Sequence, residues 1–184
     1  MRGLTRSVIA GLTGLSLVLL ATPAMAQEGS RHERRGLWVG FGVGTGSLGC
    51  NECSGERENS YSGNFRIGGT LSQKLLIGFE SNGWYKEESG VSLSMANASA
   101  VATFYPSATG GFHLKGGLGV SRLGLDVDGL GSDSETGAGA IVGLGYDFRM
   151  GKSFSLSPYF NGIAGNFDGG SANFWQVGLG LSWH

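Results

Sequence analysis

Two cysteines, Cys50 and Cys53, stand close enough in the sequence to act together. A pair at this spacing forms a disulfide, contributes to a metal site or does redox chemistry. A zinc-type site needs four ligands, and the chain offers only two cysteines with Glu52 and Glu56 as weak additions. Redox chemistry needs a lowered thiol pKa, which a helix N-terminus supplies, and no helix is predicted here. We therefore predict a structural disulfide, with metal binding and redox chemistry as the alternatives.

An acidic segment could attract a hard cation. It contains Asp126, Asp128, Asp133 and Glu135. The spacing is not that of an EF-hand, because Gly129 directly follows the second aspartate and no glutamate stands at the twelfth position. A solvated acidic loop is the preferred interpretation. A divalent cation that joins these acids to lipid phosphates remains a weaker hypothesis, and we predict no built-in metal site.

General acid–base catalysis would depend on histidine, and the chain has three. His32 lies in a charged segment and His184 is the last residue. Only His113 falls within a predicted strand, two positions before Lys115, and we expect it to form hydrogen bonds in the interior. Glycine runs such as 40–44 do not open a helix and are not phosphate-binding loops. We predict no catalytic residue, no cofactor and no enzymatic activity.

The elements that carry these residues are strands. Apolar and small or polar residues alternate with a period of two from residue 37 onward, which is typical of β-strands. Glycine accounts for 36 of the 184 residues. The predicted strands are 37–46, 61–71, 75–85, 91–105, 111–123, 136–149, 154–166 and 173–183. Eight antiparallel strands can close into an up-and-down barrel, which removes exposed edges. Pro158 lacks an N–H and is expected near a strand start or a bulge.

The charge content of these strands indicates which face points outward. They contain only six charged residues: Arg66, Glu80, Lys115, Arg122, Asp147 and Arg149. A soluble barrel would have many more charges on its outer face, since about 25% of residues in soluble chains are charged. We expect the apolar face to meet lipid, and a network of Arg66, Glu80, Lys115, Asp147 and Arg149 to lie in the lumen. The expected pairs are Arg66 with Glu80, and Asp147 with Arg149 or Lys115.

Aromatic residues near strand ends fit this orientation, because membrane barrels place aromatic girdles at both interfaces. They are Tyr61, Tyr85, Tyr105, Tyr146, Phe148 and Trp183.

The N-terminus is predicted to be a cleavable signal peptide. Arg2 and Arg6 precede an uncharged apolar stretch at 8–21, and small residues follow up to Ala26. That stretch is shorter than the roughly 20 apolar residues of a spanning helix. We expect a signal peptide at 1–26, a flexible charged leader at 27–36 and a barrel at 37–184. The mature chain would have a net charge of −3, from 11 Lys and Arg against 14 acids, which argues against nucleic acid as a partner.

Segments 111–120, 143–152 and 175–183 resemble small Gram-negative outer-membrane barrels of the OmpA/OmpX-type superfamily. The resemblance implies periplasmic termini and four outer connections, at 47–60, 86–90, 124–135 and 167–172. It also implies that the last strand is the signal read by the barrel assembly machinery, through Trp175, Val177, Leu179, Leu181 and Trp183. His184 after the final aromatic departs from that signal. The His-x-Ser pattern of lipid A deacylase barrels is absent, because Leu114 and Lys115 follow His113.

The resulting expectation is an all-β protein: a closed eight-stranded antiparallel transmembrane barrel in the cell outer membrane. Its expected partners are outer-membrane lipids and lipopolysaccharide, the assembly machinery, and an unknown surface ligand. The expected role is non-enzymatic: structural support, surface interaction or adhesion, or a narrow solute pore. The alternatives are a lipid- or peptide-modifying outer-membrane enzyme and a soluble periplasmic ligand-binding barrel.

Overall fold

The computed structural model describes residues 34–50, 57–129, 131–151 and 153–184. Within these ranges all regular secondary structure is β-strand, and no helix is long and apolar enough to cross a membrane. The predicted signal peptide, most of the leader and Cys53 lie outside the described residues. The strands are β1 (Leu37–Cys50), β2 (Glu58–Ser72), β3 (Leu75–Glu88), β4 (Val91–Phe104), β5 (Phe112–Val127), β6 (Gly131–Tyr146), β7 (Phe148–Arg149), β8 (Phe154–Phe167) and β9 (Gly170–Trp183).

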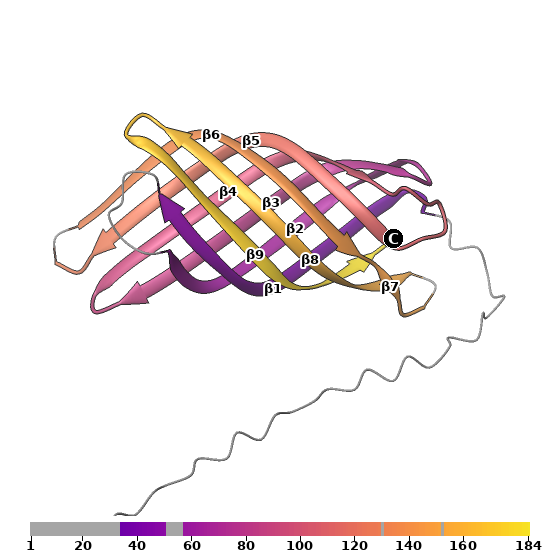
Figure 1. Ribbon diagram of the computed structural model, residues 1–184, viewed down its shortest axis with the longest axis horizontal. Helices are drawn as coiled ribbons and strands as arrows, with labels where there is room; N and C mark the ends of the chain where they lie inside the picture. The colour runs from indigo at the N-terminus through magenta and orange to yellow at the C-terminus, as the bar shows by residue number, and fades with distance from the viewer. Residues whose placement is uncertain (1–33, 51–56, 130, 152) are drawn as a thin grey trace, which may run out of the picture. The chain divides into compact units, whose positions relative to one another are not determined.

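The sheet closes on itself as an eight-stranded antiparallel barrel (Figure 1). From β1 to β6 each strand pairs with the next in sequence, β6 and β7 both pair with β8, β8 pairs with β9, and β9 returns to β1. β6 and β7 act as one strand. The same register runs from Gly145 opposite Tyr159 to Phe148 opposite Leu156. Pro158 faces the interruption between them, as expected for a residue that cannot donate to the ladder.

Several predicted strand ends are wrong, because the strands are longer than the apolar alternation. Residues 124–135 were expected to form an outer connection, yet β5 continues to Val127 and β6 begins at Gly131. The β3–β4 and β8–β9 connections are equally short. Polar side chains continue the ladder at these places, since backbone pairing does not require an apolar side chain.

The barrel has two distinct ends. The start of β1 and the end of β9 lie at one of them, called here the terminus end, and the C-terminus marks it in Figure 1. The hairpins β3–β4, β5–β6 and β8–β9 turn at the opposite end, called here the hairpin end, and β5–β6 reaches furthest (Figure 1).

Large apolar side chains cover the outside of the barrel. Leu118 is 75% exposed, Phe41 57% and Leu179 56%. Charged and amide side chains on the alternate positions, such as Glu80 and Asn161, are buried. The soluble ligand-binding barrel is therefore wrong, because it requires the reverse arrangement.

Aromatic residues gather around the terminus end of the outer face. Those exposed near the strand ends are Phe104, Phe112, Tyr146, Phe148, Phe154 and Trp183. The Tyr146 and Phe148 rings lie 4.7 Å apart. The prediction for Tyr105 is wrong: its side chain is only 3% exposed and points inward. The six exposed aromatic residues at the terminus end form a girdle of the kind that a membrane interface favours.

Candidate functional site

The middle of the lumen is a layer of polar side chains that the alternate positions of the strands supply. Lys115 on β5 donates to both carboxylate oxygens of Glu80 on β3, at 2.6 and 2.7 Å. Asn161 and Gln176 both donate to Asn82 Oδ1. The side chains of Glu80 and Lys115 are both buried. A buried ion pair depends on close contact and on additional hydrogen bonds, and Asn161 supplies one of these to Glu80 at 3.4 Å.

The structure pairs the lumen charges differently from our expectation. Arg66 lies opposite Glu80 in the β2–β3 register, but its guanidinium donates to Ser182 Oγ. Arg149 is half-buried on the short strand β7. The five predicted charges therefore do not form the predicted pairs. Glu80 and Lys115 contact each other, whereas Asp147 bonds to uncharged side chains.

Asp147 is the centre of a second polar group at the terminus end. Its carboxylate accepts hydrogen bonds from Tyr105 Oη at 2.7 Å and from Ser157 Oγ at 2.6 Å. His113 Nδ1 lies 3.7 Å from the same carboxylate. Burial raises the pKa of Tyr105, which lies in the turn after β4, and the Asp147 charge acts in the same direction. The tyrosine therefore remains a hydrogen-bond donor.

This group has serine, histidine and aspartate, but not the order that nucleophilic catalysis requires. In a catalytic triad the histidine stands between the serine and the acid. Here Ser157 and His113 both face Asp147, and Ser157 also lies 3.3 Å from Ser182. The arrangement therefore ties β5, β8 and the β6–β7 junction together rather than activating the serine.

Arg34 closes the terminus end of the barrel. The sequence interpretation placed it in a flexible leader, but it is only 2% exposed. Its guanidinium donates to the carbonyls of Gln73 (3.1 Å), Ala108 (3.1 Å) and Gly110 (2.6 Å), and it stacks 3.6 Å above the Tyr105 ring. Sequence patterning missed this contact, because a single arginine before the first strand has no periodicity.

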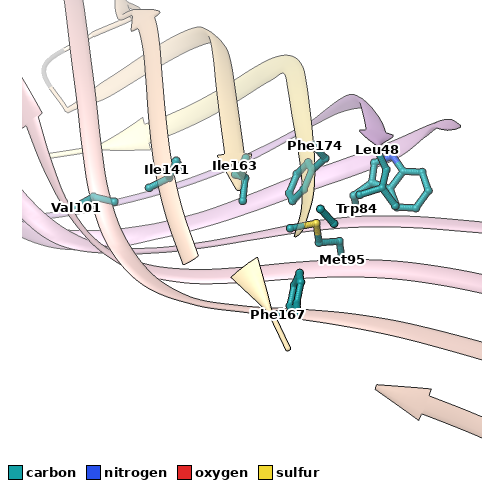
Figure 2. Packing of buried hydrophobic residues seen from close by; sticks show 9 residues of the cluster. Leu48, Trp84, Met95, Val101, Ile141, Ile163, Phe167 and Phe174 are labelled. Atoms are coloured by element: carbon teal, nitrogen blue, oxygen red, sulfur yellow. The ribbon is translucent and has the colours of Figure 1, made fainter. Parts of the chain in front are cut away.

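An apolar plug fills the lumen toward the hairpin end (Figure 2). Its members are Leu48, Trp84, Met95, Val101, Ile141, Ile163, Phe167, Ala172 and Phe174. Trp84 is 2% exposed, and its indole N–H donates to the Gly46 carbonyl at 3.0 Å. An eight-stranded barrel has an interior just wide enough for side chains to fill. The plug, Arg34 and the buried polar layer around Glu80 therefore obstruct the lumen at three levels.

The sequence analysis missed this plug, although two signals for it were present. Trp84 stands on the same face of β3 as Glu80, which was already assigned to the lumen. Ile141 and Ile163 are apolar residues on the inward-facing positions of their strands, whereas the outward-facing positions hold Val142 and Phe160.

Beyond the plug, β5 and β6 continue past the end of the β6–β8 ladder, while β5 stays paired with β4 as far as Val127 opposite Val91. The β6–β8 ladder ends at Ala138 opposite Asn166, whereas β6 begins at Gly131. One side-chain contact still joins the hairpin to β8–β9, since the Gly169 N–H donates to Glu135 Oε1 at 3.0 Å. The first residues of β6 have no strand partner on the β8 side, so this part projects from the barrel.

The predicted acidic loop is divided by this hairpin. Asp126 and Asp133 lie on the two strands of the β5–β6 ladder, with Ser132 opposite Asp126 and Leu125 opposite Asp133. Alternation therefore places them on opposite faces. Among the described residues, no three His, Cys, Asp or Glu side chains are grouped to hold a metal ion.

The other predicted site residues lie at the hairpin end and on the outer face. Cys50 ends β1 and is disulfide-bonded, while Cys53 is outside the described residues. The five residues of the expected assembly signal on β9 all point outward, with exposed fractions between 39% and 56%. Their position suits a membrane-facing strand, and recognition by the assembly machinery stays a prediction.

Comparison with known proteins connects this geometry to a family. The model described as "Outer membrane protein beta-barrel domain" matches residues 14–183. None of the curated proteins matches the sequence significantly.

Solved structures with a similar fold have low sequence identity to the chain. Neisserial surface protein A has a TM-score of 0.62 at 15% identity, covering 80% of this chain and 96% of its own. The attachment invasion locus protein Ail of Yersinia pestis, in complex with the heparin analogue sucrose octasulfate, has a TM-score of 0.57 at 16% identity, covering 81% and 99%. The N-terminal barrel domain of Pseudomonas aeruginosa OprF has a TM-score of 0.50 at 16% identity, covering 81% and 97%. At these identities the likeness concerns the fold alone.

Proposed function

The chain belongs to the outer membrane protein beta-barrel domain family, and on this premise we propose that it is a non-enzymatic, closed barrel that binds a partner outside the cell. Family membership indicates an outer-membrane location. The observation that carries the proposed role is the β5–β6 hairpin, which continues past the end of the β6–β8 ladder. In the proposed topology the hairpin end faces the exterior and the terminus end faces the periplasm.

The obstructed lumen supports this role over that of a pore. A solute would have to displace Trp84 and Phe174 from the plug and Arg34 from three backbone carbonyls. Packed interiors have few voids larger than a water molecule. The Asp147 group likewise argues against an enzyme, because its serine and histidine do not contact each other in the order that catalysis needs.

The remaining expected features are also part of the proposal. Residues 1–26 direct export and are removed, the β9 residues are recognised during barrel assembly, and the apolar outer face contacts membrane lipid and lipopolysaccharide. The surface partner differs in chemistry from the polysulfated ligand of Ail, because acids outnumber bases at the hairpin end. The described acids there are Glu58, Glu87, Glu88, Asp126, Asp128, Asp133, Glu135 and Asp168, against Arg57, Lys86 and Arg122.

A shortened hairpin tests the role. Gly124 pairs with Ser134, so replacing residues 125–133 by Asn-Gly closes a two-residue turn without changing the register below it. Intact cells that display the protein are incubated with an immobilised basic protein, an acidic protein and a sulfated polysaccharide. We expect full-length protein to increase attachment to a protein surface but not to the sulfated polysaccharide, and the shortened variant to lose that increase.

The matched control replaces only residues 128–130 by Asn-Gly and keeps the full ladder, since Val127 pairs with Gly131. It should attach like the full-length protein. Equal attachment by cells with and without the protein, or by the long and shortened forms, would contradict the surface-binding role.

A further inference from the structure

The projecting strands have an apolar surface on the side that faces the barrel axis. β4 and β5 pair there through Met95 with Leu123, Leu93 with Leu125, and Val91 with Val127. Met95 is 1% exposed and belongs to the plug, so period-two alternation puts the two outer pairs on the same face, beyond it. We call Val91, Leu93, Leu125 and Val127 the apolar cradle.

The cradle is only partly covered. Leu93 packs against the plug, whereas Val91 is 40% exposed and Leu125 is 45% exposed. It faces the axis, so the membrane lipid around the barrel does not cover it. The end of the cradle nearest the plug adjoins buried residues, which hold its side chains in place. Contiguous apolar surface that meets water is characteristic of a binding site.

The strands beside the cradle supply charge. On β6, Asp133 lies opposite Leu125 and Glu135 opposite Leu123. On β3, Lys86 lies opposite Leu93, but its ammonium is already held at 2.6 Å by Glu58 and by Glu88. Glu135 is likewise engaged, by Gly169. The carboxylate of Asp133 is exposed and accepts a hydrogen bond through Oδ1 from the Ser134 N–H at 2.8 Å, and its negative charge is available beside the cradle for a cation from a partner.

We propose that the apolar cradle binds a short cationic, amphipathic peptide segment of a partner protein. This inference rests on the proposed surface-binding function and gives the partner its chemistry. Apolar side chains of the segment cover Leu125 and Val91, and a lysine or arginine beside them pairs with Asp133. A polyanion is disfavoured by the same carboxylates, and a polar cation alone would leave the apolar pairs uncovered.

The test uses the full chain folded in zwitterionic lipid nanodiscs, so that lipid charge does not attract the probe. The probe is a fluorescein-labelled peptide of alternating lysine and leucine, and the measurement is an anisotropy titration. Leu125→Ser and Asp133→Asn should each weaken binding about tenfold, in keeping with loss of one buried leucine or one charge-assisted contact. The matched control is Asp126→Asn, which removes the same charge from the opposite face of the hairpin and should leave binding within about twofold.

Two further probes separate apolar contact from charge. A lysine–serine peptide and a glutamate–leucine peptide should both bind at least about tenfold more weakly than the lysine–leucine peptide. Heat-modifiable gel mobility verifies that each variant is folded, and Asp133→Asn changes no packed side chain.

Several results would contradict the proposal that the cradle binds a cationic, amphipathic peptide. They are equal weakening by Asp126→Asn and Asp133→Asn, equal binding of the lysine–serine peptide, and no binding of the lysine–leucine peptide at all. If peptide binding fails while the shortened hairpin still abolishes cell attachment, the proposed function stands and only this partner chemistry is wrong. If cell attachment is also unaffected by the shortened hairpin, both fail.

Discussion

At the scale of single residues, the most consequential side chain is one that precedes every strand. Arg34 joins the turn after β2, through Gln73, to the turn after β4, through Ala108 and Gly110. The three carbonyls receive donors that no other described side chain replaces, and the Tyr105 ring lies against the guanidinium. A residue outside the strands thus fixes two turns relative to each other.

Arg34→Ala should lower the free energy of unfolding by about 2–4 kcal/mol. It removes three part-buried hydrogen bonds and a cation–π contact, and interactions made by one side chain contribute less together than the sum of their separate values. Urea unfolding in detergent, followed by tryptophan fluorescence, measures the change. Arg34→Lys retains the charge but cannot reach three carbonyls, so most of the loss should remain. Equal stability of Arg34→Lys and the wild type would show that charge alone matters.

Glu80 has two cationic side chains nearby in the lumen and forms an ion pair with one of them. Arg66 on the neighbouring strand β2 lies opposite Glu80, but only Lys115, on β5, contacts it. Arg66 extends instead to Ser182. Because breaking a buried pair leaves an uncompensated charge, each of these partners limits substitution at the others.

At the scale of elements, the hairpins depend on their turn residues. Ser89 and Gly90 connect β3 to β4 with φ of 53° and 79°. Positive φ at both central residues fits a type I′ turn, whose twist matches the flanking strands. The Asp128 N–H also donates to the Gly90 carbonyl at 2.9 Å, so this turn helps to place the tip of β5 and with it the cradle.

Gly90→Ala should destabilise the barrel by about 1–2 kcal/mol, because a side chain is strained at positive φ. The added Cβ would also stand 3.3 Å from Asp128 Oδ2. Gly69→Ala is the matched control, since that glycine has ordinary φ and open space around its Cβ position. The same unfolding assay distinguishes them. A loss from Gly69→Ala as large as that from Gly90→Ala would contradict the assignment of strain to the turn.

At the scale of the whole molecule, an apolar outer surface and a filled interior determine what the barrel can do. The outer face suits hydrocarbon, and the interior has polar side chains between two obstructions. In a closed barrel every backbone group finds a partner within the sheet, which is what a lipid environment demands. This arrangement supports the proposal that the protein binds its partner through the strands that project at the hairpin end.

The plug, Arg34 and the buried polar layer around Glu80 all obstruct the lumen, so loss of one or two of them should not let ions pass. Wild-type protein should show no conductance in planar bilayers. Arg34→Ala alone, the pair Trp84→Ala with Phe174→Ala, and the triple variant should also remain closed, because the buried layer of Glu80, Lys115 and Gln176 stays in place. Trp175→Ala, which removes a tryptophan from the outer face instead, is the control for the plug substitutions. Each plug substitution costs about 3–5 kcal/mol, so gel mobility must show that the variants are folded. Conductance by the wild type would contradict a closed lumen.

The sequence by itself determined the class of fold and the orientation of the strands. Alternation is a local property, and the scarcity of charge in the strands indicates that their apolar face meets lipid rather than water. It also placed Glu80, Lys115 and Asp147 on the lumen side. Strand ends were underestimated where polar residues such as Asp126 and Asp133 continue a ladder, because their side chains give no apolar alternation.

Only the tertiary structure decided which side chains meet. Closure of the barrel fixes the stagger of neighbouring strands, and that stagger sets the height at which a residue enters the lumen. It brings Lys115 rather than Arg66 to Glu80, places Trp84 and Phe174 together in the plug, and places Asp133 beside Leu125 at the open rim. Arg34 belongs to no strand, so only the assembled turns could give it a position. Period-two patterning specifies a face for each residue but not a level, because the level depends on pairing between segments far apart in the chain.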